Sequence, residues 1–191
     1  MKNDIILSGV GGQGILSIAA VIGFAAVENK LFLKQAEVHG MSQRGGDVQS
    51  HFRLSDKPVS SDLISYGEAD LILSVEPMEA LRYLPWLSSG GWLVTNSNPF
   101  VNIPDYPDTD ELVKEIRKVE NSLIVDADRI ARETGSGRAA NIVMLGAASH
   151  FIELPLESLE NAIRKLFARK GDEIIRLNLD ALAAGRKQFR S

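Results

Sequence analysis

The sequence of 191 residues contains no cysteine and only three histidines. Without cysteine, the chain has no disulfide scaffold, no thiolate nucleophile and no thiolate ligands for an iron–sulfur cluster. His39, His51 and His150 are too far apart in the sequence to form a metal-ligand motif, so we expect no metal site. This composition fits a cytoplasmic protein.

Long apolar runs are also missing. The apolar segment 15–27 is too short to span a bilayer, so we expect no membrane association. The net charge of −4 argues against binding of nucleic acid. We expect the first strand to begin at residue 4, which leaves no room for a signal peptide. The sequence has no nucleophile elbow, Walker motif or pair of catalytic carboxylates, and we assign no catalytic residue to it.

The order of the expected elements is that of an α/β protein. Short apolar strands alternate with helical patterns, which predicts a Rossmann-like three-layer sandwich with a mostly parallel sheet. We expect a domain over residues 1–152 and a C-terminal helical extension over residues 153–191. The expected strands span residues 4–9, 31–38, 46–54, 69–75, 91–96 and 122–125, and the expected helices span 14–28, 77–84, 126–133, 138–148, 155–169 and 174–189, with a further helix starting at 109.

A glycine-rich turn follows the first strand and opens the first helix. Gly9, Gly11 and Gly14 have the G-x-G-x-x-G spacing of nucleotide-binding α/β folds. In that motif the first glycine permits a tight turn, the second lets a phosphate approach the backbone, and the third lets helix and strand pack closely. The free N–H groups and the dipole of the helix attract an anion. The alternative is a strand–helix connection without a ligand.

Dinucleotide binding also requires an acidic residue at the end of the second strand. Glu37 is the only candidate, and the residues after it do not resemble a helix, which weakens this interpretation. Instead, the segment 37–46 carries Arg44 among small polar residues and glycines, a combination that suits phosphate or carboxylate. A solvated connection between two strands is the alternative here.

The helix 138–148 is rich in small residues, which predicts close packing. Asn141 within it is either a hydrogen-bonding group at an interface or a satisfied buried amide. We expect Gly185 to weaken the end of the last helix.

Four ordered segments together resemble the gamma domain of 2-oxoacid:ferredoxin oxidoreductases. The resemblance covers about residues 4–152, and the length and the C-terminal extension are most similar to the small (beta) subunits of indolepyruvate:ferredoxin oxidoreductases. The segments are Gly9–Gly14, Met41–Gly46, Ala69–Leu73 with Glu76–Arg82, and Asn141–Gly146.

The resemblance implies an assembly that oxidatively decarboxylates a 2-oxoacid to its acyl-CoA and passes the electrons to ferredoxin. Thiamine diphosphate and iron–sulfur clusters are then expected on a large partner subunit, and coenzyme A is a co-substrate. The isolated chain is expected to be inactive, and a homodimer is one way to cover its apolar helices. The motif match and the anion argument together place cofactor contacts at Gly9, Gly11, Gly12, Gln13, Gly14, Ser42, Arg44, Gly45 and Asn141.

Two other interpretations stay open at this point. One is a stand-alone nucleotide- or dinucleotide-binding oxidoreductase that uses the glycine turn for its own cofactor. The other is a purely structural subunit that completes the surface of a partner. The structural subunit differs from the resemblance-based interpretation in whether the glycine turn contacts a ligand.

Overall fold

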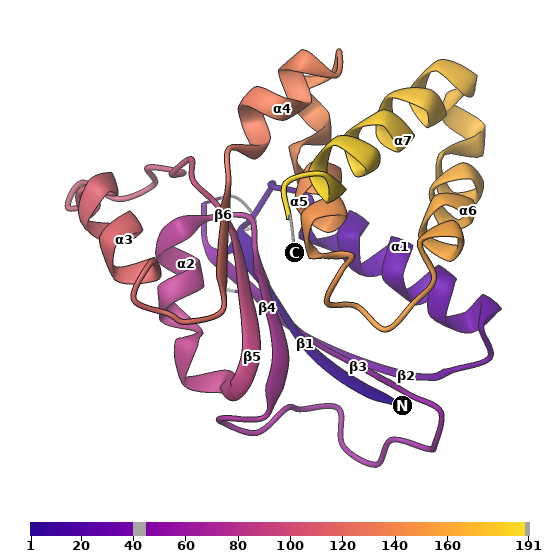
Figure 1. Cartoon of the computed structure of the whole chain (residues 1–191), viewed down its shortest axis with the longest axis horizontal. Coiled ribbons are helices and arrows are strands. Elements are labelled where there is room, and N and C mark those ends of the chain that lie inside the picture. Colours follow the sequence, from indigo (N-terminus) through magenta and orange to yellow (C-terminus); the bar gives the residue numbers. More distant parts are fainter. Residues whose placement is uncertain (40–44, 190–191) are drawn as a thin grey trace.

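The computed structural model describes residues 1–39 and 45–189, and these fold around a six-stranded sheet (Figure 1). The strands are β1 (Lys2–Val10), β2 (Phe32–His39), β3 (Asp47–Ser55), β4 (Ala69–Ser74), β5 (Leu87–Asn96) and β6 (Ser122–Val125). The helices are α1 (Ile15–Glu28), α2 (Pro77–Arg82), α3 (Thr109–Ile116), α4 (Ala127–Glu133), α5 (Ala140–Ala148), α6 (Leu156–Phe167) and α7 (Asp172–Arg186), with short 3-10 turns η1 (Leu84–Trp86), η2 (Gly137–Ala139) and η3 (Ala168–Lys170).

The strands lie in the order β2-β3-β1-β4-β5-β6. β1 pairs in parallel with β4, β4 with β5, and β5 with β6, whereas β3 runs antiparallel to both β1 and β2. The chain between β2 and β3 is too short for a crossover, which needs about a dozen residues or more, so β3 must return antiparallel. The mostly parallel sheet predicted from the sequence is confirmed, with β3 as the reversed strand.

Helices cover both faces of the sheet, which gives the three expected layers. Alternate residues of β1 point to opposite faces: Ile5 and Leu7 join the larger apolar cluster with α1 and α5, whereas Ile6 joins a smaller cluster beside α2 and α3. Figure 1 shows α2 and α3 on one side of the sheet and α1, α5, α6 and α7 on the other.

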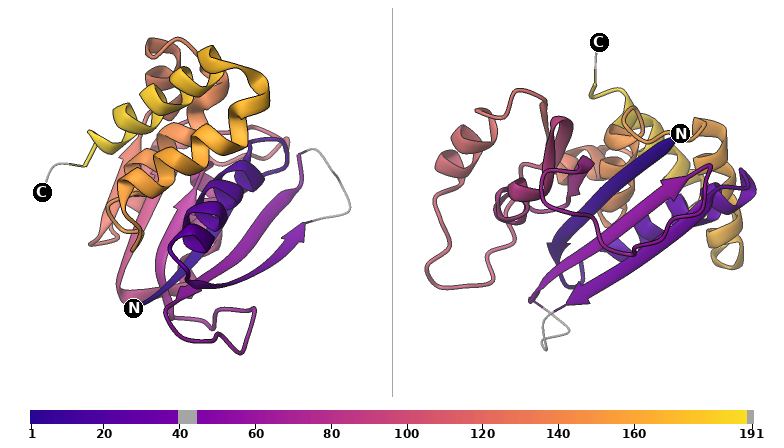
Figure 2. Two further views of the ribbon diagram at one scale, coloured as in Figure 1. Left: turned by 90° about the vertical axis from the view of Figure 1, so that its right-hand side faces the viewer. Right: turned by 90° about the horizontal axis from the view of Figure 1, so that it is seen from below.

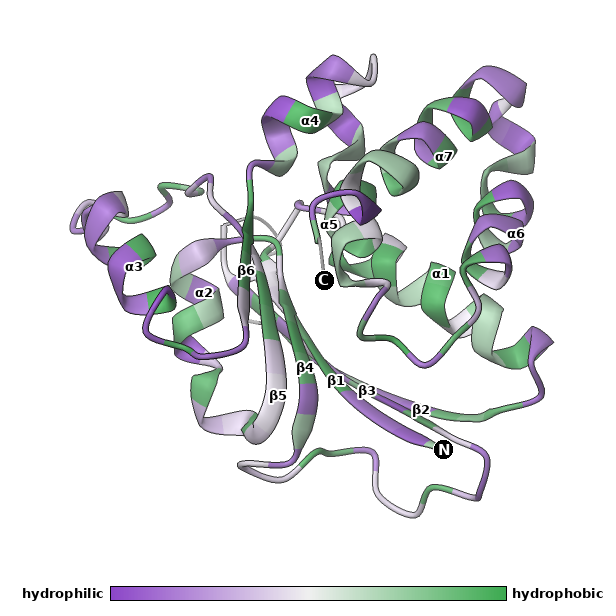
Figure 3. Cartoon of the chain, in the orientation of Figure 1, coloured by the Kyte–Doolittle hydropathy of each residue, from purple (hydrophilic) through white to green (hydrophobic). Residues whose placement is uncertain are grey.

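Helix α1 is apolar almost all round, as Figure 3 shows, and it therefore needs cover on several sides. The sheet and α5 cover part of it, and α6 lies alongside it in the left view of Figure 2. Leu16, Phe24 and Val27 on its outer side remain exposed.

Two glycines let α5 and α7 touch backbone to backbone. A Cβ atom on Gly146 would lie 2.1 Å from the Leu182 carbonyl oxygen, and a Cβ atom on Gly185 would lie 1.9 Å from the Val143 carbonyl oxygen. The close packing predicted for the small-residue helix is thus present. Gly185, expected to weaken the end of α7, lies one residue before that end and also makes this contact.

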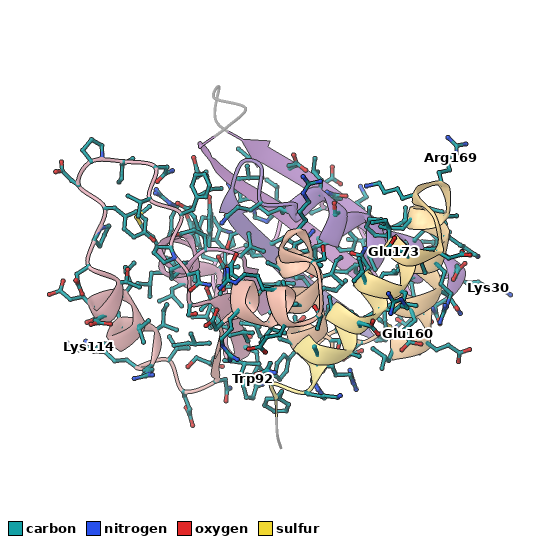
Figure 4. All side chains as sticks on the ribbon, turned by 90° about the horizontal axis from the view of Figure 1, so that it is seen from above. Lys30, Trp92, Lys114, Glu160, Arg169 and Glu173 are labelled. Atoms are coloured by element: carbon teal, nitrogen blue, oxygen red, sulfur yellow. The ribbon has the colours of Figure 1, made fainter. Side chains whose placement is uncertain are left out.

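The C-terminal helices share the core of the preceding residues. Leu159 and Ile163 of α6 and Leu182 of α7 belong to the larger apolar cluster together with β1 and α1. Trp92 of β5, labelled in Figure 4, stacks on Phe151 with a centroid distance of 4.2 Å. The domain boundary at residue 152 stays a prediction, and the helices on its C-terminal side pack into one core with the rest. Within the described residues, no helix has both the length and the apolar character needed to cross a membrane.

Candidate functional site: a cleft at the glycine turn

The glycine turn lies at the carboxyl ends of β1 and β4, where the chain changes sides of the sheet. Helix α1 follows β1 onto one face, and α2 follows β4 onto the other. In open α/β sheets a crevice forms at such a position, because the two connections diverge. The fold therefore places the predicted anion site at the position where α/β proteins bind ligands.

Two glycines of the G-x-G-x-x-G spacing serve internal packing. A Cβ atom on Gly9 would lie 2.4 Å from Cγ2 of Val75, which follows β4. Gly14 has a φ of 82°, and a Cβ atom on it would lie 2.5 Å from Nδ2 of Asn141. Both positions need glycine because neighbouring side chains occupy the space.

The glycine that faces open space is Gly12, which lies between the positions of the motif. Its φ is 102°, and no heavy atom lies within 4 Å of the position that a Cβ atom would take. Gly11, by contrast, donates its N–H to the Gly46 carbonyl at 2.8 Å. The backbone position most open to an approaching ligand is thus Gly12, whereas the motif points to Gly11.

Helix α1 begins without a side-chain cap. Gly14 is its N-cap residue, and no side chain accepts a hydrogen bond there. Within the described residues, the N–H groups of Gly12, Gly14, Ile15 and Leu16 have no hydrogen-bond acceptor. Uncapped N–H groups at a helix start, with the positive end of its dipole, favour a bound anion.

Two amide side chains fix the shape of the turn. Gln13 accepts a hydrogen bond from the Val10 N–H at 2.8 Å and donates to the Val75 carbonyl at 3.4 Å, so it joins the ends of β1 and β4. Asn141 donates from Nδ2 to the Gly14 carbonyl at 3.1 Å. Asn141 is half-buried, its NH2 group makes this hydrogen bond within the chain, and the residue also lines the cleft.

Two adjoining cavities flank the turn, one of about 480 Å³ and one of about 330 Å³. Both are lined by Gly12, Gln13, Arg138 and Asn141. The larger cavity is further lined by Val75, Asn96, Asn98, Pro99, Phe100, Asp128, Gly137, Ala140 and Met144. The smaller is further lined by Gly14, Ser17, Ser136, Ala139, Phe167, Lys170, Ile174, Leu177 and Asn178.

Cationic side chains border these cavities. Arg138 is exposed in η2 and lines both, and Lys170 of η3 lines the smaller one. With the uncapped start of α1, they make this part of the cleft favourable for a phosphate or a carboxylate. Sequence reasoning named Arg138 only as the first residue of a small-residue helix, because its proximity to the turn depends on the tertiary fold.

Hydrogen-bonded polar side chains also line the larger cavity. Asn96 and Asn98 both donate to Oδ2 of Asp128 at 2.9 Å, and Asn98 also donates to Asp126 at 3.0 Å. Sequence reasoning did not select these residues. The available signal was their position at or within three residues of the ends of β5 and β6, because the carboxyl ends of parallel strands meet at one edge of the sheet.

The second predicted segment runs beside the glycine turn at its described end. The Gly45 N–H donates to the Gly11 carbonyl at 3.5 Å, and the Gly45 carbonyl accepts from Nδ2 of Asn102 at 2.6 Å. Ser42 and Arg44 lie outside the described residues, so their part in the site stays a prediction.

The histidines whose side chains are described make structural hydrogen bonds. Nδ1 of the buried His51 accepts from the Ile64 N–H at 3.0 Å, and burial lowers the pKa of His51. Nε2 of His150 lies 3.0 Å from the Arg186 carbonyl oxygen. Across residues 1–39 and 45–189, no group of three or more His, Asp or Glu side chains is arranged to hold a metal ion.

The sheet order bears on the dinucleotide interpretation. Glu37 lies on β2, the edge strand, and β3 separates β2 from β1. In dinucleotide-binding folds the second strand lies beside the first, so that its acidic residue reaches the ribose of a nucleotide on the turn. The inserted β3 therefore removes the geometry on which that interpretation depends.

Comparisons with known proteins agree with this fold. The sequence model of the pyruvate ferredoxin/flavodoxin oxidoreductase family matches residues 4–188. The indolepyruvate oxidoreductase subunit IorB of Archaeoglobus fulgidus is 38% identical over 98% of this chain and 96% of its own length.

Two solved structures share the fold. The pyruvate oxidoreductase subunit PORC of Thermotoga maritima has a TM-score of 0.74 and 25% identity, over 97% of this chain and 96% of that chain. A 2-oxoglutarate:ferredoxin oxidoreductase of Magnetococcus marinus, solved with 2-oxoglutarate, coenzyme A and succinyl-CoA bound, has a TM-score of 0.78 at 21% identity. The match covers 98% of this chain but only 31% of that longer chain. On the family match and the full-length relative, the protein belongs to the pyruvate ferredoxin/flavodoxin oxidoreductase family.

Proposed function

We propose that this chain is the small subunit of a thiamine-dependent 2-oxoacid:ferredoxin oxidoreductase that converts indolepyruvate and related 2-oxoacids to their acyl-CoA products. The observation that carries the proposal is the match to the Archaeoglobus fulgidus subunit, which spans nearly all of both chains.

The proposal divides the work between two subunits. Thiamine diphosphate supplies the carbon–carbon cleavage and iron–sulfur clusters the electron transfer to ferredoxin, and we assign both to the large partner subunit. This chain has no cysteine with which to hold a cluster. We place the complex in the cytoplasm, where a cysteine-free subunit is at no disadvantage.

We assign the anionic part of coenzyme A to the cleft at the glycine turn. The open backbone at Gly12, the uncapped start of α1 and the guanidinium of Arg138 suit its phosphate groups. The apolar side chains of Val75, Phe100 and Met144 line the larger cavity and suit the uncharged part of the ligand. Ser42, Arg44 and Gly45 belong to the same assignment, as the sequence motif suggests.

The test is to purify this chain alone and together with its proposed large subunit. The complex should reduce a viologen dye when supplied with indolepyruvate and coenzyme A, and it should prefer indolepyruvate to pyruvate and 2-oxoglutarate. The isolated chain should show no activity, because it lacks the redox groups. Dye reduction by the isolated chain would contradict the proposal.

A measurement of NAD binding distinguishes the dinucleotide-binding alternative from the proposed function. Affinity of the isolated chain for NAD tighter than about 1 mM would revive a stand-alone oxidoreductase. A purely structural subunit predicts instead that substitutions in the cleft leave the coenzyme A dependence of the complex unchanged.

A further inference from the structure

One wall of the larger cavity is an irregular segment between β5 and α3. Residues 97–108 contain three prolines and no helix or strand, yet Pro99 and Phe100 line the cavity. An irregular wall has no backbone ladder of its own, so its position depends on contacts with the rest of the fold. Figure 1 shows the segment leaving the end of β5 and turning towards α3.

The carboxyl group of Glu76 provides two of those contacts. Glu76 is fully buried, two residues after the end of β4. It is the N-cap residue of α2 and accepts a hydrogen bond from the Glu79 N–H at 2.8 Å. Its other oxygen, Oε1, accepts from the Phe100 N–H at 3.3 Å and from the hydroxyl of Tyr106. One buried carboxyl group thus joins the start of α2 to both ends of the segment Phe100–Tyr106.

The backbone of Glu76 is itself fixed, and no ion pair competes for its side chain. The Ser74 hydroxyl donates to the Glu76 carbonyl at 2.6 Å. Within the described residues, Glu76 takes part in no ion pair, so its oxygens serve these donors. Burial and the nearby carboxyl group raise the pKa of the Tyr106 hydroxyl, which therefore remains a donor at neutral pH.

We propose that Glu76 is a positioning residue for the cleft: through Phe100 and Tyr106 it fixes the wall against which the uncharged part of the bound ligand packs. This inference rests on the proposed function for the identity of the ligand, coenzyme A. It adds a role for the Glu76–Arg82 segment, which the glycine-turn site does not use. Asn102 of the same segment is held as well, by its hydrogen bond to the Gly45 carbonyl.

The decisive variant is Tyr106→Phe, which removes one hydrogen bond of the wall and leaves the cap of α2 intact. The matched control is Tyr83→Phe, because the Tyr83 hydroxyl also bonds a carboxyl group, but that of Asp47 on β3 and not that of Glu76. Both variants are made in the full chain and assembled with the large subunit. Two readouts are compared: amide hydrogen exchange over residues 97–106, and the kinetic constants of the complex at varied coenzyme A.

We expect Tyr106→Phe to speed exchange in residues 97–106 and to raise the KM for coenzyme A about threefold to tenfold, with kcat changed less than twofold. Tyr83→Phe should change neither readout. Glu76→Gln keeps an acceptor oxygen for the wall, so its rise in KM should be smaller than that of Glu76→Ala. Because Tyr106→Phe leaves the core unchanged, the test does not depend on whether Glu76→Ala folds.

Two results would overturn the inference, and they differ in what they say about the ligand. If Arg138→Ala raises the KM for coenzyme A but Tyr106→Phe does not, the ligand site stands and Glu76 does not position it. If neither variant changes the KM, coenzyme A does not bind in this cleft, and the proposed ligand assignment fails together with the inference.

Discussion

Glycines bring the backbone close to its neighbours in two regions of this molecule, but the neighbours differ. At the crossing of α5 and α7, a Cβ atom on Gly146 or Gly185 would lie about 2 Å from a backbone carbonyl oxygen. A backbone atom cannot move aside as the end of a flexible side chain can. At the end of β1 and in the turn after it, Gly9 and Gly14 face the side chains of Val75 and Asn141, whereas Gly12 faces open space. A glycine needed for packing and a glycine available to a ligand are therefore distinguished by what a Cβ atom would meet.

The comparison predicts its largest effect at Gly185. Gly185→Ala gains about 1 kcal/mol of helix propensity but forces α5 and α7 apart, which costs about 3 kcal/mol or more. We expect a net loss of about 2 kcal/mol or more in the free energy of unfolding, measured by chemical denaturation.

The control for this prediction is Gly90→Ala. Gly90 is an exposed residue of β5 with no heavy atom within 4 Å of its Cβ position. The free energy of unfolding of the Gly90→Ala variant should stay within about 0.5 kcal/mol of that of the original protein. Equal stability of the two variants would show that α5 and α7 do not pack as closely as described.

The next effect is expected at Gly14, where the neighbour is a flexible side chain. Gly14→Ala strains a left-handed residue and displaces the Asn141 amide, which should cost about 2 kcal/mol. The variant should also raise the KM of the complex for coenzyme A, because Asn141 and the start of α1 shift together. Denaturation and steady-state kinetics measure the two effects, and a variant that loses neither stability nor affinity would contradict the packing role of Gly14.

At Gly12 we expect a smaller effect on stability and a clear effect on ligand binding. Gly12→Ala meets no neighbouring atom, so only the left-handed backbone opposes it, at about 1 kcal/mol. The added methyl group points into the space that the ligand is proposed to occupy. We expect weaker binding of coenzyme A by the complex with a nearly unchanged melting temperature. A variant with reduced stability and unchanged binding would reverse the comparison between Gly12 and Gly14.

Much of this fold was predictable from the sequence because its signals are local. Apolar runs bounded by acids or glycines gave the strands, and the Glu76–Pro77 pair marked the start of α2, as the cap confirms. The position of β3 between β1 and β2 was not predicted, since strand order depends on pairing between distant segments.

The site was predictable in part for the same reason. The motif located the turn, but it could not show that Gly11 is hydrogen-bonded to Gly46 while Gly12 is open. Arg138 and Asn96 reach the cleft from segments far along the chain, and no spacing rule connects them to the turn.

The central claim is that the cleft at the glycine turn binds the anionic part of coenzyme A, and Arg138 tests it most directly. Arg138 is exposed, so its replacement should not disturb the core, and Arg132 on α4 is an exposed arginine that lines neither cavity. In the assembled complex, Arg138→Ala should raise the KM for coenzyme A about tenfold to hundredfold, because it removes a charge-assisted contact that contributes about 1.5–3 kcal/mol. Arg138→Lys should recover part of the loss, and Arg132→Ala should match the original complex. An Arg138→Ala complex with the original KM for coenzyme A would contradict the account.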